Sequence, residues 1–187
     1  ISAALGFAEA AKQQKLGHKA VALIGDGSLT GGLAFEGLNN AGAAKTDILV
    51  ILNDNNISID RNIGAIHEYL LNITTDPRYN KAKKHIWDKL GDGRFRKLIQ
   101  KMVVGTKSYL VRHSGGDLFE AMGFRYFGPI DGNDIEQVIR TLQKLKELGG
   151  PLILHTLTTK GKGYAPAEAN QTVWHAPGIF DPETGER

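Results

Sequence analysis

Short apolar runs alternate with stretches of helical periodicity along most of the chain. The apolar runs have the length expected of strands that are buried on both faces of a parallel sheet. Strands are therefore predicted at Ala20–Ile24, Asp47–Leu52, Phe124–Phe127 and Leu152–Leu157. Apolar residues at helical spacing predict helices at Ile1–Leu16, Thr30–Ala44 and Asp134–Leu148. Because helices lie between strands along the chain, the expected fold class is α/β, with a doubly wound and mostly parallel sheet.

Composition narrows the class of protein. With 187 residues, 41% of them hydrophobic, the chain can bury the core of one domain. It contains no cysteine, which excludes disulfides, a thiolate zinc site and a cysteine nucleophile, and favours the cytoplasm. The longest apolar runs are about five residues, against the ~20 that cross a bilayer, so no membrane span is expected. The chain starts at Ile1 without a leader pattern, so we expect a piece of a larger protein.

Positive charge is concentrated in one segment. The formal net charge is +3, yet residues 61–112 hold 12 Lys and Arg against four acidic residues. This segment has Trp87 and Phe95 near its basic residues but lacks interleaved stacking platforms and any recognisable nucleic-acid motif. We therefore expect a solvated helical insertion at about 60–116 and no nucleic-acid partner. The last residues, about 160–187, show little periodicity and are expected to form an extended tail that covers a face or reaches another domain.

A Gly-Asp-Gly turn, Gly25–Gly27, stands where the first predicted strand ends. Ligands of doubly wound sheets bind at the carboxyl ends of strands, and glycines there let a ligand approach the backbone. Free N–H groups beside Ser28 suit an anion such as a phosphate. A dinucleotide-binding fingerprint is disfavoured because Thr30 replaces its third glycine, and a Walker A loop because its Gly-Lys-Ser/Thr is absent. The carboxylate of Asp26 would repel a phosphate unless a divalent cation lay between them, so Asp26 predicts Mg²⁺.

A cluster of amide and acidic residues, 53–56, follows the second predicted strand. Asn55 comes 29 positions after Asp26, the length of one βαβ crossover, which places its amide oxygen at the same sheet edge. Together with the backbone carbonyl of Ile57, these residues offer the oxygen ligands that Mg²⁺ prefers. Without the Gly-Asp-Gly turn, such a cluster would more often be a simple turn. A second Gly-Asp-Gly, residues 91–93, follows no buried strand and has no Asn at the same spacing, so a plain turn is predicted there.

The turn, its spacing and the Asn cluster resemble the diphosphate-binding domain of thiamine diphosphate enzymes. That signature is shared with transketolases and 2-oxo-acid dehydrogenases, and it indicates the class of cofactor. The Lys-Gly-Lys-Gly-Tyr segment at residues 160–164 and the later Trp174-His175 are similar to the 1-deoxy-D-xylulose-5-phosphate synthase family. Longer segments similar to that family are Gly25–Gly42, Ile48–Ser58, Gly128–Asp134 and Thr159–Glu168.

The resemblance implies a role for each matching residue at the metal and diphosphate. Asp26, the Asn55 side chain and the Ile57 carbonyl would bind Mg²⁺. The family often has Met where Ile57 stands, and only the carbonyl would coordinate. Asn55 also belongs to the cofactor-binding set, together with the backbones of Gly27 and Ser28, which would contact the diphosphate.

The resemblance also implies roles in the tail. Lys160 would neutralise diphosphate charge, Tyr164 would contact the cofactor, and His175 would be a catalytic residue near the substrates. From spacing alone, the lysine and the histidine would be ordinary loop residues. The remaining histidines match nothing in the family and are expected to be structural: His18, His67, His85, His113 and His155.

For the parent protein, the resemblance implies thiamine diphosphate and Mg²⁺ as cofactors. Pyruvate and D-glyceraldehyde 3-phosphate would be condensed to 1-deoxy-D-xylulose 5-phosphate with loss of CO₂, by a cytoplasmic homodimer. Residues 1–187 would be a partial diphosphate-binding domain. The Glu that acts on the aminopyrimidine ring matches nothing here, so the rest of the parent chain would supply the pyrimidine-binding domain. Two alternatives stay open: a transketolase with a ketose phosphate donor, and a non-catalytic nucleotide-binding module on the same sheet.

Overall fold

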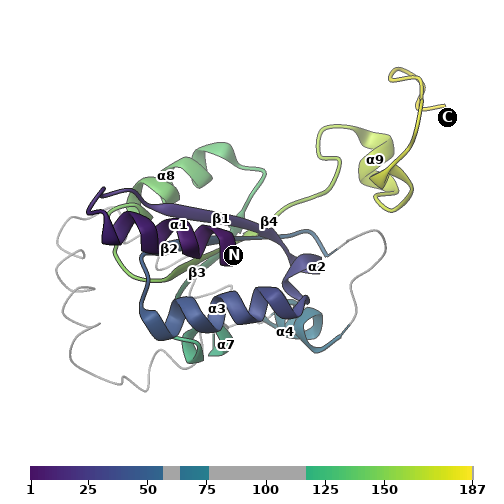
Figure 1. Cartoon of the computed structure of the whole chain (residues 1–187). Helices are drawn as coiled ribbons and strands as arrows, with labels where there is room; N and C mark the ends of the chain where they lie inside the picture. Colours follow the sequence, from purple (N-terminus) through teal and green to yellow (C-terminus); the bar gives the residue numbers. More distant parts are fainter. Residues whose placement is uncertain (57–63, 76–116, 187) are drawn as a thin grey trace.

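One parallel sheet with helices on both faces forms the centre of the molecule (Figure 1). A computed structural model describes residues 1–56, 64–75 and 117–186. The strands are β1 (Ala20–Gly25), β2 (Ile48–Asp54), β3 (Arg125–Asp131) and β4 (Leu152–Leu157). They lie in the order β1-β2-β4-β3, so the last strand in sequence is inserted between its two predecessors. The expected α/β class with a parallel sheet is confirmed.

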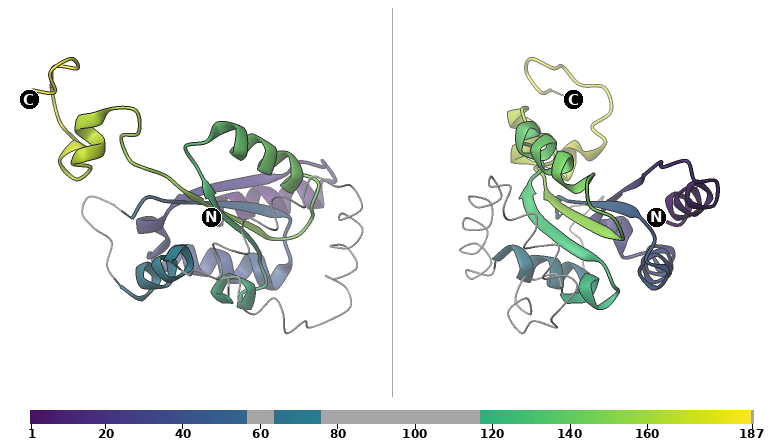
Figure 2. Two further views of the ribbon diagram at one scale, coloured as in Figure 1. Left: turned by 180° about the vertical axis from the view of Figure 1, so that it is seen from behind. Right: turned by 90° about the vertical axis from the view of Figure 1, so that its left-hand side faces the viewer.

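Different helices cover the two faces of this sheet (Figure 2). One face carries α3 (Gly32–Ala44), α4 (Ala65–Thr75) and α7 (Asp117–Ala121), with α1 (Ser2–Gln13) beside α3. The other face carries α8 (Ile135–Leu145). Strand residues alternate between the faces: Val50 and Leu52 of β2 pack under α3, whereas Leu49 packs toward α8. This alternation decides which polar residues at the strand ends share a face.

Three strands reach further than their apolar runs predict. β1 extends to Gly25, β2 to Asp54 and β3 to Asp131. Backbone pairing does not depend on side-chain polarity, so a strand continues while its neighbour supplies hydrogen-bond partners. The sheet therefore carries the polar residues at its carboxyl edge on regular strand backbone.

The predicted helix Thr30–Ala44 begins differently from expectation. The residues before it form a separate short helix, α2 (Asp26–Leu29), and α3 starts at Gly32. The two are separated at Gly31, whose backbone is extended with φ −73° and ψ 139°. The Gly-Asp-Gly turn thus passes directly from β1 into a helical turn that begins at Asp26.

The tail leaves the carboxyl end of β4 and stands off from the sheet (Figure 1). It contains a short helix, α9 (Ala165–Ala169), and a 3₁₀ turn, η1 (Val173–His175), which its weak periodicity did not predict. Trp174 lies edge-on to Tyr164 and to Phe180, with ring centroids 5.1 and 4.8 Å away. These aromatic rings give the tail a small core of its own.

Of the predicted insertion at about 60–116, the description covers residues 64–75, which include α4. The second Gly-Asp-Gly and the Ile57 carbonyl lie outside the described residues. Across the described ranges, no helix combines the length and the apolar character that a membrane span requires.

Candidate metal and diphosphate site

The Gly-Asp-Gly turn lies at the carboxyl edge of the sheet. Gly25 ends β1 in an extended conformation, and Asp26 starts α2 with only 5% of its surface exposed. The Thr30 hydroxyl donates to the carbonyl oxygen of Gly27 at 2.7 Å and closes the short helix. The backbone of Gly27 is half-buried and Ser28 is exposed, so both lie at the surface of this edge.

The polar cluster 53–56 lies beside this turn. Gly25 pairs with Asn53 in the parallel register of β1 and β2. The next residue of each segment, Asp26 and Asp54, therefore lies at the same edge of the sheet. Asn55 comes directly after β2 and is half-buried. The tertiary structure therefore brings two residues that are 29 positions apart to neighbouring strand ends, as one βαβ crossover requires.

Asp54 is the most buried acidic group of this edge, with 1% of its side chain exposed. Its Oδ1 atom accepts from the Asn56 N–H at 3.1 Å, and its Oδ2 atom accepts from Nε2 of His155 at 3.0 Å. Burial alone would raise the pKa of Asp54. Hydrogen bonds from His155 and Asn56, the charge of His155 and a side-chain hydrogen bond with Asp26 outweigh burial and lower the pKa of Asp54. Asp54 is therefore a carboxylate at neutral pH.

His155 lies on β4 and is fully buried. Its Nδ1 atom is 2.6 Å from the hydroxyl of Tyr126 on β3, so Tyr126, His155 and Asp54 form a continuous chain of hydrogen bonds across three neighbouring strands. The sequence pattern predicts no separate role for Asp54 and a structural role for His155. A signal was present, because Asp54 lies two positions after Leu52 and so falls on the buried α3 face of β2.

Strand β4 also holds the backbone that leads to Asn55. The Thr156 hydroxyl donates to the Leu52 carbonyl at 3.1 Å, and the Thr158 hydroxyl donates to the Asn53 side chain at 2.9 Å. The Thr158 N–H donates to the Asp54 carbonyl at 2.9 Å. Each residue from Leu52 to Asp54 thus accepts a hydrogen bond from β4 or from the residue that follows β4.

The donor set at this edge fits a hard divalent cation. It contains the buried Asp26 carboxyl group and the half-buried Asn55 amide, with the Asp54 carboxyl group between them in the chain of polar residues at this edge. Two acidic groups in a largely buried position repel one another when both are ionised, and a divalent cation offsets that repulsion. Oxygen donors of this kind select Mg²⁺ over zinc, and no group of three or more His, Cys, Asp or Glu side chains forms a rival metal cluster among the described residues.

The site residues predicted in the tail make their contacts within the tail. The Nζ atom of Lys160 donates to Nδ1 of His175, since an ammonium group has no acceptor. Tyr164 packs against Trp174, and its hydroxyl is buried with no hydrogen-bond partner in the described part of the chain. In Figures 1 and 2, α9 stands apart from α2, so the structure groups the predicted residues into an edge set and a tail set.

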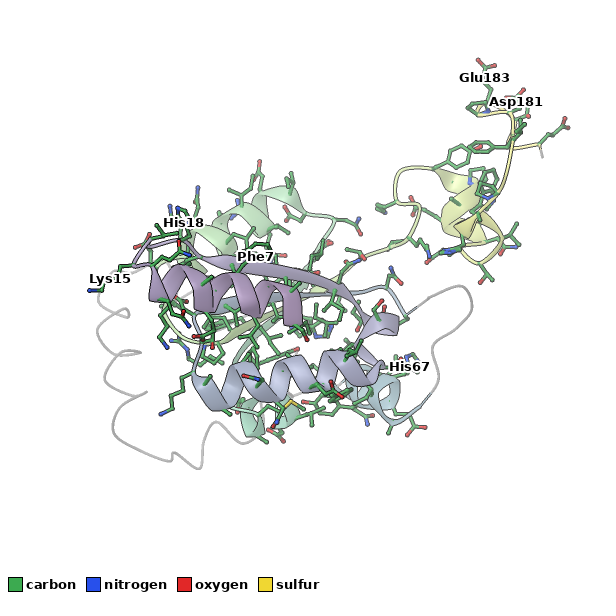
Figure 3. All side chains as sticks on the ribbon, in the orientation of Figure 1. Phe7, Lys15, His18, His67, Asp181 and Glu183 are labelled. Atoms are coloured by element: carbon green, nitrogen blue, oxygen red, sulfur yellow. The ribbon has the colours of Figure 1, made fainter. Side chains whose placement is uncertain are left out.

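In Figure 3, His18 lies at the left and His67 at the right of the main body, while Asp181 and Glu183 lie at the far tip of the tail. His85 and His113 lie outside the described residues. Of the histidines expected to be structural, His155 contacts the Asp54 side chain at the end of β2.

Comparison with known proteins gives a consistent set of relatives. Residues 1–158 match the sequence profile of the family described as 1-deoxy-D-xylulose-5-phosphate synthase. The 1-deoxy-D-xylulose-5-phosphate synthases of Phocaeicola vulgatus and Cytophaga hutchinsonii are 50% and 48% identical to the chain over its whole length. The chain spans 30% of the length of each of these relatives. A transketolase from Campylobacter jejuni has a similar structure, with a TM-score of 0.56 and 25% identity over 90% of this chain and 21% of that one.

Proposed function

The chain belongs to the 1-deoxy-D-xylulose-5-phosphate synthase family, and from this premise we propose that it supplies the metal and diphosphate half of a thiamine diphosphate-dependent active site. The full-length protein would condense pyruvate with D-glyceraldehyde 3-phosphate, releasing CO₂ and forming 1-deoxy-D-xylulose 5-phosphate. The observation that carries the proposal is the meeting of the buried Asp26 carboxyl group with the end of β2 at one sheet edge.

Asp26 and Asn55 would bind Mg²⁺ through side-chain oxygens, and Ile57 would add its backbone carbonyl. The ion would lie between these residues and the diphosphate, which the backbones of Gly27 and Ser28 would contact. Lys160 would offset the remaining negative charge of the diphosphate. Support for this arrangement comes from the oxygen-only donor set and from the register that pairs Gly25 with Asn53.

Bound thiamine diphosphate supplies the carbanion chemistry that removes CO₂ from pyruvate and forms the new carbon–carbon bond. The residues of this chain would hold the cofactor by its charged end. His175 would hold a proton on Nε2 near the substrates, because its Nδ1 atom accepts from Lys160. Tyr164 would contact the cofactor, and its hydroxyl is buried with no hydrogen-bond partner among the described residues.

The remaining parts of the site belong to the rest of the parent chain, since this chain spans 30% of its relatives' length. We place the Glu for the aminopyrimidine ring in a pyrimidine-binding domain outside this sequence and expect a homodimer. The absence of cysteine supports a cytoplasmic location.

The metal assignment is tested with Asp26→Ala and Asn55→Ala in the full-length protein. Substitution of a residue that hydrogen-bonds a metal ligand typically weakens metal binding by about 10–100-fold. Loss of a ligand itself should therefore weaken Mg²⁺-dependent thiamine diphosphate binding by about 100-fold or more. Calorimetric titration of thiamine diphosphate with and without Mg²⁺ measures this. Asp92→Ala, in the second Gly-Asp-Gly, is the matched control and should retain wild-type affinity. Unchanged affinity in the Asp26 variant would show that the metal does not bind here.

The rival functions give different results with the wild-type protein. A transketolase, which the structural likeness to the Campylobacter enzyme favours, would bind the same cofactor but use a ketose phosphate donor. Product analysis with pyruvate and glyceraldehyde 3-phosphate separates it from the synthase. A non-catalytic nucleotide-binding module would show no thiamine diphosphate affinity in the same titration.

A further inference from the structure

A hydrogen-bonded chain of Tyr126, His155 and Asp54 runs through the sheet and ends beside Asn55. We propose that His155 and Tyr126 are positioning residues that hold Asp54, and through it the side chain of Asn55, in the geometry that binds a divalent cation. The inference rests on the proposed metal site, and it assigns a role to the buried His155 and the half-buried Tyr126, which belong to no ligand set.

Asp54 is the link between this chain and the metal ligand. Its Oδ1 atom accepts from the N–H of Asn56, so one carboxylate oxygen closes a turn around the intervening Asn55. Asn56 has a left-handed backbone with φ 59°, which Asn tolerates well. A rotation of the Asp54 carboxylate would open this turn and displace the residue inside it. The orientation of Asn55 therefore depends on what holds Asp54.

His155 holds the other oxygen of Asp54. The carboxylate accepts only, so Nε2 of His155 must carry the proton of the 3.0 Å contact. The two side chains are 1% exposed or less, so the bond is shielded from bulk solvent. The backbone of β4 is itself paired with β2, with His155 opposite Leu52, so the imidazole is anchored on regular sheet two residues from the turn.

Tyr126 holds His155 in turn. Its hydroxyl is 2.6 Å from Nδ1, which gives the second ring nitrogen a partner and prevents the imidazole from turning over. The Tyr126 ring is stacked on Phe119 with centroids 5.8 Å apart, so the phenol is fixed by packing as well. Because both ring nitrogens of His155 have partners, the Asp54 carboxylate that it contacts keeps one orientation. Residues that hydrogen-bond and orient metal ligands commonly set metal affinity.

A pair of substitutions at His155 in the full-length protein separates positioning from general stability. In His155→Gln the side-chain amide reaches the position of Nε2 and still donates to Asp54. In His155→Asn the amide is one methylene shorter and faces Tyr126 instead. Both place a neutral amide in the same buried space, so an effect on folding alone would be similar in the two. Binding of Mg²⁺ by calorimetry, and of Mn²⁺ by the loss of its free electron-spin resonance signal, are read at saturating thiamine diphosphate.

We expect metal binding about 10–100-fold weaker in His155→Asn and close to the wild-type value in His155→Gln. Equal affinities in the two variants, whether both normal or both reduced, overturn the proposal. Tyr126→Phe removes a single hydroxyl and provides a second test if the Asn variant does not fold. Metal affinity should fall in this variant too, and an unchanged value also overturns the proposal.

Asp26→Asn is the reference variant that distinguishes failure of the proposed metal site from failure of the positioning role. If Asp26→Asn binds metal normally, the metal site itself is wrong. If Asp26→Asn loses the metal while His155→Asn and Tyr126→Phe retain it, the site stands and only the positioning role fails.

Discussion

Gly42, in the second half of α3, lies against the backbone that follows α7. A Cβ atom added there would be 1.7 Å from the carbonyl oxygen of Met122, and one added at the facing Gly123 would be 3.2 Å from the Gly42 carbonyl oxygen. Glycine within a helix ordinarily destabilises it by about 0.5–1 kcal/mol relative to alanine. Here the close approach of two backbones outweighs that preference.

Gly42→Ala should therefore lower the free energy of unfolding by about 1–3 kcal/mol, because the helix must move away from its neighbour. Gly6 is the matched control, since it lies within α1 and an added Cβ there meets no atom within 4 Å. Gly6→Ala should raise stability by up to about 1 kcal/mol. Urea unfolding followed by circular dichroism measures both, and a stabilising Gly42→Ala would contradict the packing described here.

At the scale of elements, Tyr69 joins α4 to α7. The Leu118 N–H at the start of α7 donates to the Tyr69 hydroxyl oxygen at 3.0 Å, and the Tyr69 ring meets Phe119 edge-on at 6.0 Å. Phe119 stacks in turn on Tyr126. The same aromatic column that ties the two helices together thus supports the phenol beside His155.

Burial, together with the negative charges of Asp117 and Glu120, raises the pKa of Tyr69 from 10.0 to about 12. An unfolded chain loses this proton first, so the contribution of Tyr69 to stability is fully present below pH 10 and is lost as the pH rises toward 12. Tyr69→Phe should lower the free energy of unfolding by about 1 kcal/mol at neutral pH, since the Leu118 N–H loses its partner. The variant should also lose stability less steeply between pH 10 and 12. Parallel slopes for the two proteins in alkaline thermal unfolding would exclude the raised pKa.

At the scale of the whole molecule, the chain presents one edge of a sheet and a detached tail. Asp26 and the end of β2 form the edge, while Lys160, His175 and Tyr164 lie in the tail beyond it. The proposed function assigns these groups to the metal and diphosphate half of the site. It places the Glu that acts on the aminopyrimidine ring outside this sequence.

The 187-residue chain on its own should therefore form no 1-deoxy-D-xylulose 5-phosphate, even with saturating thiamine diphosphate, Mg²⁺ and both substrates. Half of a site leaves the other end of the cofactor open to water, so any residual cofactor affinity should be weak and dependent on Mg²⁺. The full-length protein under the same conditions is the positive control. Turnover by the isolated chain near the usual enzyme range of about 1–10³ s⁻¹ would show that it holds a complete site.

Local pattern was sufficient for the fold class. β4 was predicted within its observed bounds, and the other strands were predicted in place but too short. Apolar runs and helical periodicity are properties of neighbouring residues, so they can be read along the chain. The strand order β1-β2-β4-β3 and the separate helix α2 could not be read in this way, because both depend on how distant segments pack.

For the site, the sequence by itself determined that Asp26 and Asn55 would share a sheet edge, because one crossover of known length connects them. Only the tertiary structure brought Asp54 into contact with His155, from positions 101 residues apart on strands whose adjacency no local signal encodes. A histidine in an apolar run shows nothing of its partner until the strands are paired. The environment of a buried polar group is set by long-range packing, so only the tertiary structure decided which residue holds Asp54.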